Sequence, residues 1–274
     1  MPFTPAVKEQ FTLKLAIAGL PGAGKSYTSC LIAQALSNGE RFAFLDCEKR
    51  KSRKYADLFA FDAQDLTTSF SLSNYTKAIK EAENAGYKVL IIDGLSQLWE
   101  GKGGVKELVD NIAKRDRIST FNAWQFGNSL LQDFVNVILA SPMHIICTLR
   151  CKIDYAQEPG SNGKTQHKRV GLAPIQKDNL EYEFDLFAEI NHLHELIFYK
   201  SLCTKLSGKV LAMSQEGEIK RLVAILSKWM EGAPPARQLA SAAGASQPAL
   251  NQDQHVGIVF HHEDGFHCAL FIGA

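Results

Sequence analysis

Residues 19–26 read Gly19-Leu20-Pro21-Gly22-Ala23-Gly24-Lys25-Ser26, a complete G-x-x-x-x-G-K-S pattern. Glycines let the backbone wrap closely around a phosphate, so that successive N–H groups point at its oxygens. The lysine of this pattern supplies positive charge for the β- and γ-phosphates, and the hydroxyl after it is a ligand for Mg²⁺. The stretch therefore predicts a nucleotide site, and the alternative is a glycine-rich turn that only resembles the motif.

The flanking sequence favours the nucleotide site. Residues 14–19 form an apolar run of strand length, and residues 27–36 have helical spacing before a Ser-Asn-Gly stop. A strand, a glycine loop and a helix in this order place a helix N-terminus at the anion. We expect ATP to be contacted by eight residues of this region: Gly19, Pro21, Gly22, Ala23, Gly24, Lys25, Ser26 and Tyr27.

The composition is that of a folded protein with one large core. Of the 274 residues 46% are hydrophobic, which is ample for one core and a small appendage. The net charge is +1, so any nucleic-acid surface must be a local patch. There is no apolar run of membrane-span length and no leader-like N-terminus, so we expect a cytoplasmic protein without a membrane partner. The six scattered cysteines are typical of reduced thiols rather than disulfides.

Apolar segments of strand length alternate with segments of helical spacing along the first 150 residues. Such alternation predicts an α/β fold with a mostly parallel sheet and helices on both faces. We expect strands at 14–19, 41–46, 88–93 and 142–149, and helices at 27–36, 55–61, 74–84, 105–118 and 121–140. A polar loop at 153–170 then precedes short strands near 183–190, 194–200 and 208–213 and a helix at 218–230.

The composition also suggests where the chain divides. We expect one globular domain over residues 1–231, which would contain the whole predicted sheet. Residues 232–254 are rich in Ala, Ser, Gln and Pro, which is typical of a flexible linker. Residues 255–274 alternate enough to predict a tail hairpin.

Two acidic residues follow predicted strands at the edge of the phosphate loop. Asp93 ends the strand at 88–93 after four apolar residues, where its carboxylate is expected to hold the Mg²⁺ shell. Glu48 lies two residues beyond Asp46 at the end of another strand. A carboxylate there is able to take a proton from water aimed at the γ-phosphate. The alternatives are a turn-capping aspartate and a solvated glutamate.

The fourth strand ends in further candidates. Thr148 is placed to hydrogen-bond the γ-phosphate or its water, and Arg150 to contact phosphate or to begin a binding loop, although each is otherwise an ordinary strand terminus. The following loop combines basic residues, an aromatic residue and glycines, which suits nucleic-acid contact, while a solvated loop is the alternative. The basic candidates are Arg150, Lys152, Lys164, Lys168 and Arg169.

Four segments together resemble the RecA-type ATPase core. They are the phosphate loop, Phe44-Leu-Asp-Cys-Glu48, Val89-Leu-Ile-Ile-Asp-Gly-Leu-Ser96, and Ile145-Ile-Cys-Thr-Leu-Arg150 with the loop that follows. A fifth stretch at 170–185 is similar to the segment that small phage and prophage ATPases of this type carry there. The resemblance covers about residues 11–215 and is closest to those phage proteins, which are associated with single-stranded DNA binding and annealing.

The resemblance implies a P-loop NTPase fold of RecA type and a set of residue roles. Lys25, Glu48 and Thr148 would be catalytic, with Glu48 activating the water, and Ser26 and Asp93 would hold Mg²⁺. The loop at 153–170 would be a mobile DNA-binding loop.

The resemblance also bears on DNA contact and on assembly. Residues 101–104, with Lys102, would be part of a second, shorter DNA-binding loop. RecA-like proteins assemble as rings or filaments in which a neighbour's basic residue reaches the γ-phosphate. Lys200 and Lys205 lie in the matching region, but the sequence around them departs from the pattern, which argues against activation across subunits. Residues 1–10 are too short for the polymerisation helix of full RecA proteins, so full strand exchange is not expected.

The first functional hypothesis is therefore a Mg²⁺-dependent ATPase that binds single-stranded DNA in phage-type recombination or annealing. The alternatives are a P-loop kinase acting on a small metabolite and a nucleotide-dependent scaffold that binds a protein through its tail. None of the arginines lies in a recognisable kinase lid, and only the composition of residues 232–274 supports the scaffold. Stimulation of hydrolysis by DNA separates the first hypothesis from the other two.

Overall fold

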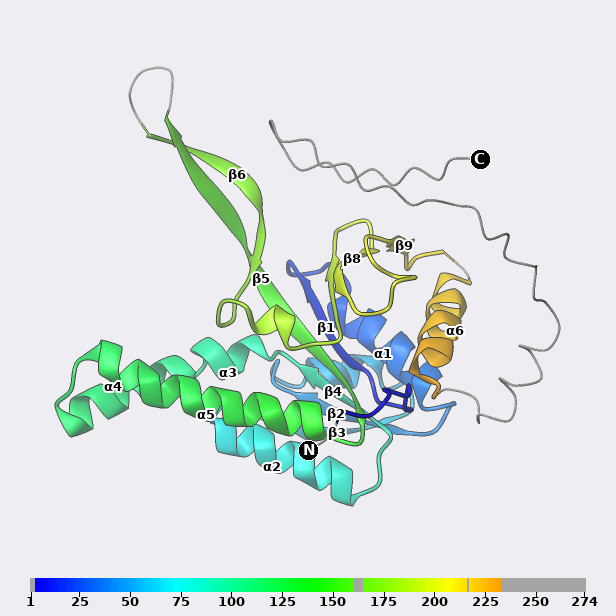
Figure 1. Ribbon diagram of the computed structural model, residues 1–274, viewed down its shortest axis with the longest axis horizontal. Helices are drawn as coiled ribbons and strands as arrows, with labels where there is room; N and C mark the ends of the chain where they lie inside the picture. The colour runs from blue at the N-terminus through cyan, green and yellow to red at the C-terminus, as the bar shows by residue number, and fades with distance from the viewer. Residues whose placement is uncertain (1–2, 160–164, 216, 233–274) are drawn as a thin grey trace, which may run out of the picture. The chain divides into compact units, whose positions relative to one another are not determined.

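The computed structural model describes residues 3–159, 165–215 and 217–232, with the backbone alone for 154–159 and 165–170. In this part of the chain a nine-stranded sheet is flanked by helices (Figure 1). The strands are β1 (Lys14–Gly19), β2 (Phe42–Asp46), β3 (Phe61–Asp65), β4 (Val89–Asp93), β5 (His144–Pro159), β6 (Thr165–Pro174), β7 (Leu186–Ile190), β8 (Glu195–Ser201) and β9 (Val210–Ala212). The helices are α1 (Lys25–Leu36), α2 (Leu72–Asn84), α3 (Ser96–Glu100), α4 (Val105–Asp116), α5 (Thr120–Ala140), α6 (Glu218–Met230) and the 3-10 helices η1 (Lys51–Tyr55) and η2 (Leu180–Tyr182).

The strand order is β3-β2-β4-β5-β1-β7-β8-β9, with β6 paired to β5 outside this path. In this order, the first six strands, β3, β2, β4, β5, β1 and β7, run parallel to one another. β8 and β9 then extend the sheet antiparallel. One strand, β5, lies between β1, which leads into the phosphate loop, and β4, which ends in Asp93. The parallel strands open at the same edge, and the chain has the predicted α/β P-loop NTPase fold of RecA type.

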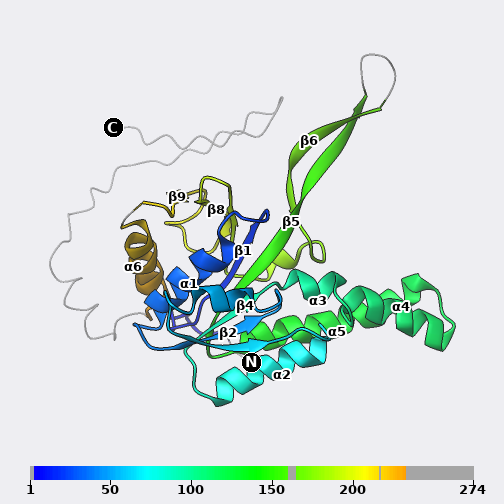
Figure 2. The ribbon, with the colours of Figure 1, turned by 180° about the vertical axis from the view of Figure 1, so that it is seen from behind.

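The sheet is buried on both faces because its strands alternate between two apolar cores. In β1, Leu15 and Ile17 belong to the core that α1 and α6 cover, whereas Ala16 and Ala18 face the core of α2, α4 and α5. Figures 1 and 2 show these helices on opposite sides of the sheet. Full burial of one such Leu or Ile contributes about 1.5–3 kcal/mol. The two cores hold β1 rigid up to the residue where the phosphate loop begins.

The structure corrects two elements around the sheet. Residues 55–61 are not a helix, since η1 ends at Tyr55 and the edge strand β3 begins at Phe61. The strand expected at 142–149 begins at His144 and continues to Pro159, and residues expected to form a polar loop there pair with β6 as an antiparallel hairpin. In Figure 1 this hairpin leaves the central sheet.

One smaller correction concerns a helix. The short helix α3 was not predicted. No helix in the described part of the chain is long and apolar enough to cross a membrane.

Five of the six cysteines are free and buried, while Cys268 lies outside the described residues. The linker and tail predictions also concern residues 233–274, which lie outside that part, and stay predictions.

Candidate functional site

The phosphate loop joins β1 to α1 in a backbone conformation that requires glycine. Gly22 and Gly24 have φ of +80° and +98°, in the left-handed region that side chains disfavour. A Cβ on Gly19 would lie 2.6 Å from the carbonyl oxygen of Ile190, so bulk is excluded there too. Gly24 caps α1 without a side-chain hydrogen bond, so no capping side chain competes for the N–H groups at this helix N-terminus. Such a terminus suits a phosphate group.

Lys25 lies folded over the loop. Its Nζ donates to the carbonyl oxygens of Gly19 at 2.9 Å and Leu20 at 3.0 Å. Burial lowers the pKa of Lys25, and the negative charge of Asp93 opposes this shift. The next predicted contact, Tyr27, is 42% exposed, and its ring lies 5.4 Å from that of Phe59.

Asp93 meets two hydroxyl groups from neighbouring elements. Its carboxylate accepts from Ser26 Oγ at 2.9 and 3.0 Å and from Thr148 Oγ1 at 2.6 Å, and Thr148 Oγ1 accepts from the N–H of Gly94 at 2.9 Å. Burial raises the pKa of Asp93, which is 2% exposed, while the hydrogen bonds from Thr148 and Ser26 lower it. The three predicted residues Ser26, Asp93 and Thr148 are thus brought together.

The Ser26 hydroxyl and the Asp93 carboxylate are hard oxygen donors that fit Mg²⁺. The described residues contain no group of three or more His, Cys, Asp or Glu able to hold a metal. Mg²⁺ is commonly bound by one or two carboxylates together with the phosphates of a substrate, rather than by a complete protein cage. The donor set therefore fits a cation that arrives with a nucleotide.

Glu48 is positioned by Asp46, a role that the sequence analysis missed. Asp46 is fully buried, and its Oδ1 accepts the N–H groups of Glu48 at 2.8 Å and Arg50 at 3.2 Å. Its Oδ2 accepts from the N–H and the hydroxyl of Ser52 at 2.8 and 2.5 Å. Aspartate commonly accepts the backbone N–H two residues ahead, so the D-x-E spacing itself carried a signal for this turn.

The Glu48 carboxylate is paired with two cations. Arg150 Nε and Nη2 lie 2.8 and 2.6 Å from Oε1, and Lys51 Nζ lies 3.2 Å from Oε2. The Glu48 side chain is 14% exposed and that of Arg150 37% exposed. The structure thus places Arg150 against the predicted water-activating residue, a contact between β5 and the β2 loop that the sequence did not indicate.

These residues line one cleft with about 400 Å³ of space. That size lies within the range of small-molecule sites, about 300–1,000 Å³. The cleft is lined by Pro21, Gly22, Gly24, Lys25, Ser26, Glu48, Lys51, Tyr55, Asp93, Thr148 and Arg150. Lys51 and Tyr55, from η1, were not among the predicted contacts.

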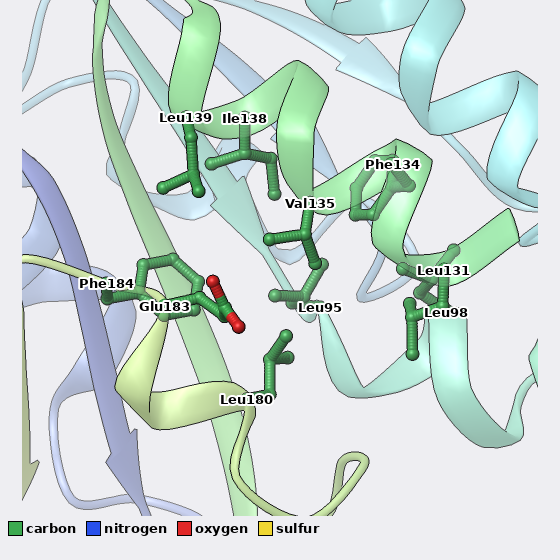
Figure 3. Close-up of a pocket in the computed structure, with 10 residues that line it drawn as sticks. All are labelled: Leu95, Leu98, Leu131, Phe134, Val135, Ile138, Leu139, Leu180, Glu183 and Phe184. Atoms are coloured by element: carbon green, nitrogen blue, oxygen red, sulfur yellow. The ribbon is translucent and has the colours of Figure 1, made fainter. Parts of the chain in front are cut away.

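A second cavity, between α5 and η2, is of a different kind (Figure 3). Glu183 is the one charged residue among its lining side chains, which are otherwise apolar and include Leu95, Phe134 and Phe184. Its volume is about 10 Å³, no more than one water requires. This cavity is therefore a packing gap rather than a nucleotide site.

The support of the phosphate loop from β7 and β8 was also missed. His194, in the turn between these strands, has its Nδ1 3.0 Å from the carbonyl oxygen of Ala23. The same nitrogen would lie 3.0 Å from a Cβ on Gly24. This contact joins residues 171 positions apart, so no local sequence signal identifies it.

The predicted nucleic-acid residues do not form one described cluster. Lys102 lies between α3 and α4, and Lys152 is exposed at the base of the β5–β6 hairpin. Lys168 and Arg169 belong to β6, but their side chains, like all of Lys164, lie outside the described part. Their contact with nucleic acid stays a prediction.

The two lysines weighed for a role across a subunit interface lie after β7. Lys200 Nζ donates to the carbonyl oxygens of Tyr182 and Phe184 within its own chain. Lys205 is exposed. A role for either in a neighbouring subunit's site stays untested.

The fold and the phosphate loop define a nucleotide-binding P-loop ATPase domain. The family described as AAA domain matches residues 12–219, and the chain belongs to that family. Among solved structures, a KaiC-like protein from the hyperthermophilic archaeon Pyrococcus horikoshii is similar, with 14% identity and a TM-score of 0.39 over 75% of this chain and 92% of that chain. No curated protein matches the sequence.

Proposed function

We propose that the protein hydrolyses ATP with Mg²⁺, binds single-stranded DNA through the β5–β6 hairpin, and acts in phage-type recombination or annealing. The proposal rests chiefly on one observation. β5 carries Thr148, which is hydrogen-bonded to Asp93 at 2.6 Å, and the same strand continues into the hairpin, where its pairing with β6 shifts register between Asp154 and Tyr155. A strand shared by both regions is able to couple nucleotide state to DNA contact.

In the proposed reaction, bound Mg–ATP supplies the γ-phosphoryl group and a metal that neutralises its developing charge. The N-terminus of α1 and Lys25 would hold the phosphates, and Ser26 with Asp93 would hold the cation. Thr148 keeps the Asp93 carboxylate oriented. Glu48 orients the attacking water and takes its proton.

Two other functions predict different products. A P-loop kinase would transfer the phosphoryl group to a metabolite, and the sequence offers Arg50 and Arg53 after β2 as candidate lid arginines. Both are exposed and lie 2.9 and 3.1 Å from Asp65, so they are engaged away from the cleft. A scaffold that binds a protein partner would hydrolyse ATP slowly and without regard to DNA.

The test is ATP hydrolysis measured with and without single-stranded DNA, in wild type and in Glu48→Gln. We expect DNA to raise the rate and the variant to lose most of it, because glutamine cannot accept the proton. A wild-type rate that ignores DNA contradicts the DNA proposal. Phosphate appearing on an acceptor establishes the kinase instead.

A further inference from the structure

Arg150 connects three parts of the molecule. Its side chain binds Glu48, its N–H donates to Ser96 Oγ at 2.9 Å, and its carbonyl oxygen accepts the N–H of Ile175 at 2.7 Å. Ser96 begins α3, just after Asp93, and Ile175 directly follows β6. One residue thus contacts the predicted base Glu48, the start of α3 just after Asp93, and the residue that follows β6.

Arg150 also lies where β5 changes partners. It is the last β5 residue paired with β1, opposite Gly19. The next residue, Cys151, pairs with Pro174 of β6. Arg150 is therefore the residue at which β5 passes from the central sheet into the hairpin, whose own pairing shifts register further along, between Asp154 and Tyr155.

We propose that Arg150 is a positioning residue that restrains Glu48 until the hairpin is occupied. Two N–H groups of Arg150 occupy Oε1 of Glu48, while Lys51 contacts Oε2. A carboxylate engaged in this way is less available to accept a water proton. Ligand on the hairpin shifts Arg150, frees Glu48 and raises the rate, an inference that rests on the proposed ATPase function.

The pair has the strength that a reversible restraint needs. The Arg150 side chain is 37% exposed and that of Glu48 is 14% exposed, so water reaches the pair from the arginine and screens part of the attraction. A partly screened pair is displaced by a ligand that favours the other arrangement of the two side chains. The hydrogen bonds that the buried Asp46 carboxylate accepts leave the backbone of Glu48 in place when the side chain is released.

The test uses Arg150→Met, which retains an unbranched apolar stem, and Arg150→Lys, which retains the charge without the two-pronged contact. Arg115→Met is the matched control, because Arg115 lies on α4 and pairs with its exposed neighbour Asp116. For each protein, kcat and KM are measured with and without single-stranded DNA, and binding of a fluorescent ATP analogue is titrated. Thermal unfolding identifies any variant that fails to fold.

We expect Arg150→Met to raise kcat without DNA about two- to fivefold, the factor that loss of a weak ion pair corresponds to. KM and analogue binding stay at the wild-type level, the DNA effect shrinks by the same factor, and Arg150→Lys lies in between. A lower kcat with weaker analogue binding shows instead that Arg150 contacts phosphate. A lower kcat with unchanged binding shows that it assists Glu48, and an unchanged kcat shows no restraint, so each of these overturns the proposal.

The two proposals fail in different ways. If DNA does not stimulate the wild type but Arg150→Met is faster than wild type, then Arg150 does restrain Glu48 and DNA is not the ligand that releases it. A wild type without any hydrolysis, or one in which Glu48→Gln is fully active, rejects the proposed ATPase mechanism and the restraint with it. If both Arg150 variants are unfolded, the residue is structural and the proposal is wrong.

Discussion

Replacing Asp46 with asparagine is the sharpest test of how Glu48 is held. The aspartate presents two oxygens to four donors, and each oxygen receives two of them. Asparagine has the same shape but only one oxygen. Whichever way its amide is oriented, the NH₂ group faces two donors that lose their acceptor.

The size of the effect follows from these contacts. The cheaper orientation turns the NH₂ group towards Ser52, whose hydroxyl is able to rotate and accept from it, so the buried N–H of Ser52 alone loses its acceptor. A buried donor left without a partner costs about 1–3 kcal/mol, which is a large part of the about 5–15 kcal/mol of a typical domain. Residues Lys49 and Arg50 have φ of +60° and +65°, and the loss of Asp46 contacts removes what holds this strained turn. Glu48 then moves, and a shift of about 1 Å lowers the rate by up to about a hundredfold.

Urea unfolding of the full chain measures the stability, and steady-state hydrolysis measures kcat. Asp62→Asn is the control, because Asp62 is a strand aspartate on neighbouring β3 whose side chain is 47% exposed and pairs with Arg41. It should change the unfolding free energy by less than about 1 kcal/mol and leave kcat unchanged. If Asp46→Asn behaves like this control, the buried turn does not position Glu48 and the reasoning is refuted.

Three further predictions concern other parts of the structure. In Gly94→Ala, the new Cβ at φ +104° lies 3.3 Å from Cγ and Oε1 of Glu48, so we expect both kcat and the free energy of unfolding to fall. Gly39→Ala is the control: at φ +81°, with no atom within 4 Å of its Cβ, it should lower the free energy of unfolding by about 1–2 kcal/mol and leave kcat unchanged. Lys25→Met should weaken binding of a fluorescent ATP analogue at least about tenfold without lowering the unfolding free energy, because burial already disfavours its charge; unchanged affinity would contradict the phosphate assignment. Burial lowers the pKa of His144 to about 4, so below about pH 6.5 the unfolded state binds a proton that the folded state does not, and the free energy of unfolding falls as the pH drops towards 4. Urea unfolding across this pH range should show a shallower fall in the free energy of unfolding for His144→Gln than for wild type. Equal slopes in the two proteins would count against the assignment.

The parts of the fold that were predicted from sequence are those with local patterns. β1 and α6 were predicted at their observed bounds, because a run of apolar residues and a helical period each lie within one segment. The edge strand β3 was missed, since its residues Phe61-Asp-Ala-Gln-Asp65 are polar on one face and have one paired edge. The sequence predicts a loop where β5 and β6 form the hairpin, because pairing between two polar segments leaves no apolar alternation in either.

The candidate site divides in the same way. The phosphate loop and Asp93 were recognisable because each motif is contiguous with the strand that positions it. His194 and the Arg150–Glu48 pair were not, because they bridge 171 and 102 positions of the chain. Such contacts depend on strand order, which a single sequence does not state. The sequence therefore indicated the groups to which we assign the proposed chemistry and missed the groups that hold them.

The position of β5 in the sheet explains why Arg150 matters for the proposed function. As the strand between β1 and β4, it places Thr148 beside Asp93 and Arg150 beside Gly19. Glu48 comes from β2, on the far side of β4, so the only described β5 residue that reaches it is Arg150, with its long side chain. A short residue at this position would leave β5 in contact with the metal side of the cleft alone. The arginine extends the influence of the hairpin strand to the base, which is why its substitution distinguishes a regulated ATPase from one in which hairpin and catalysis are independent.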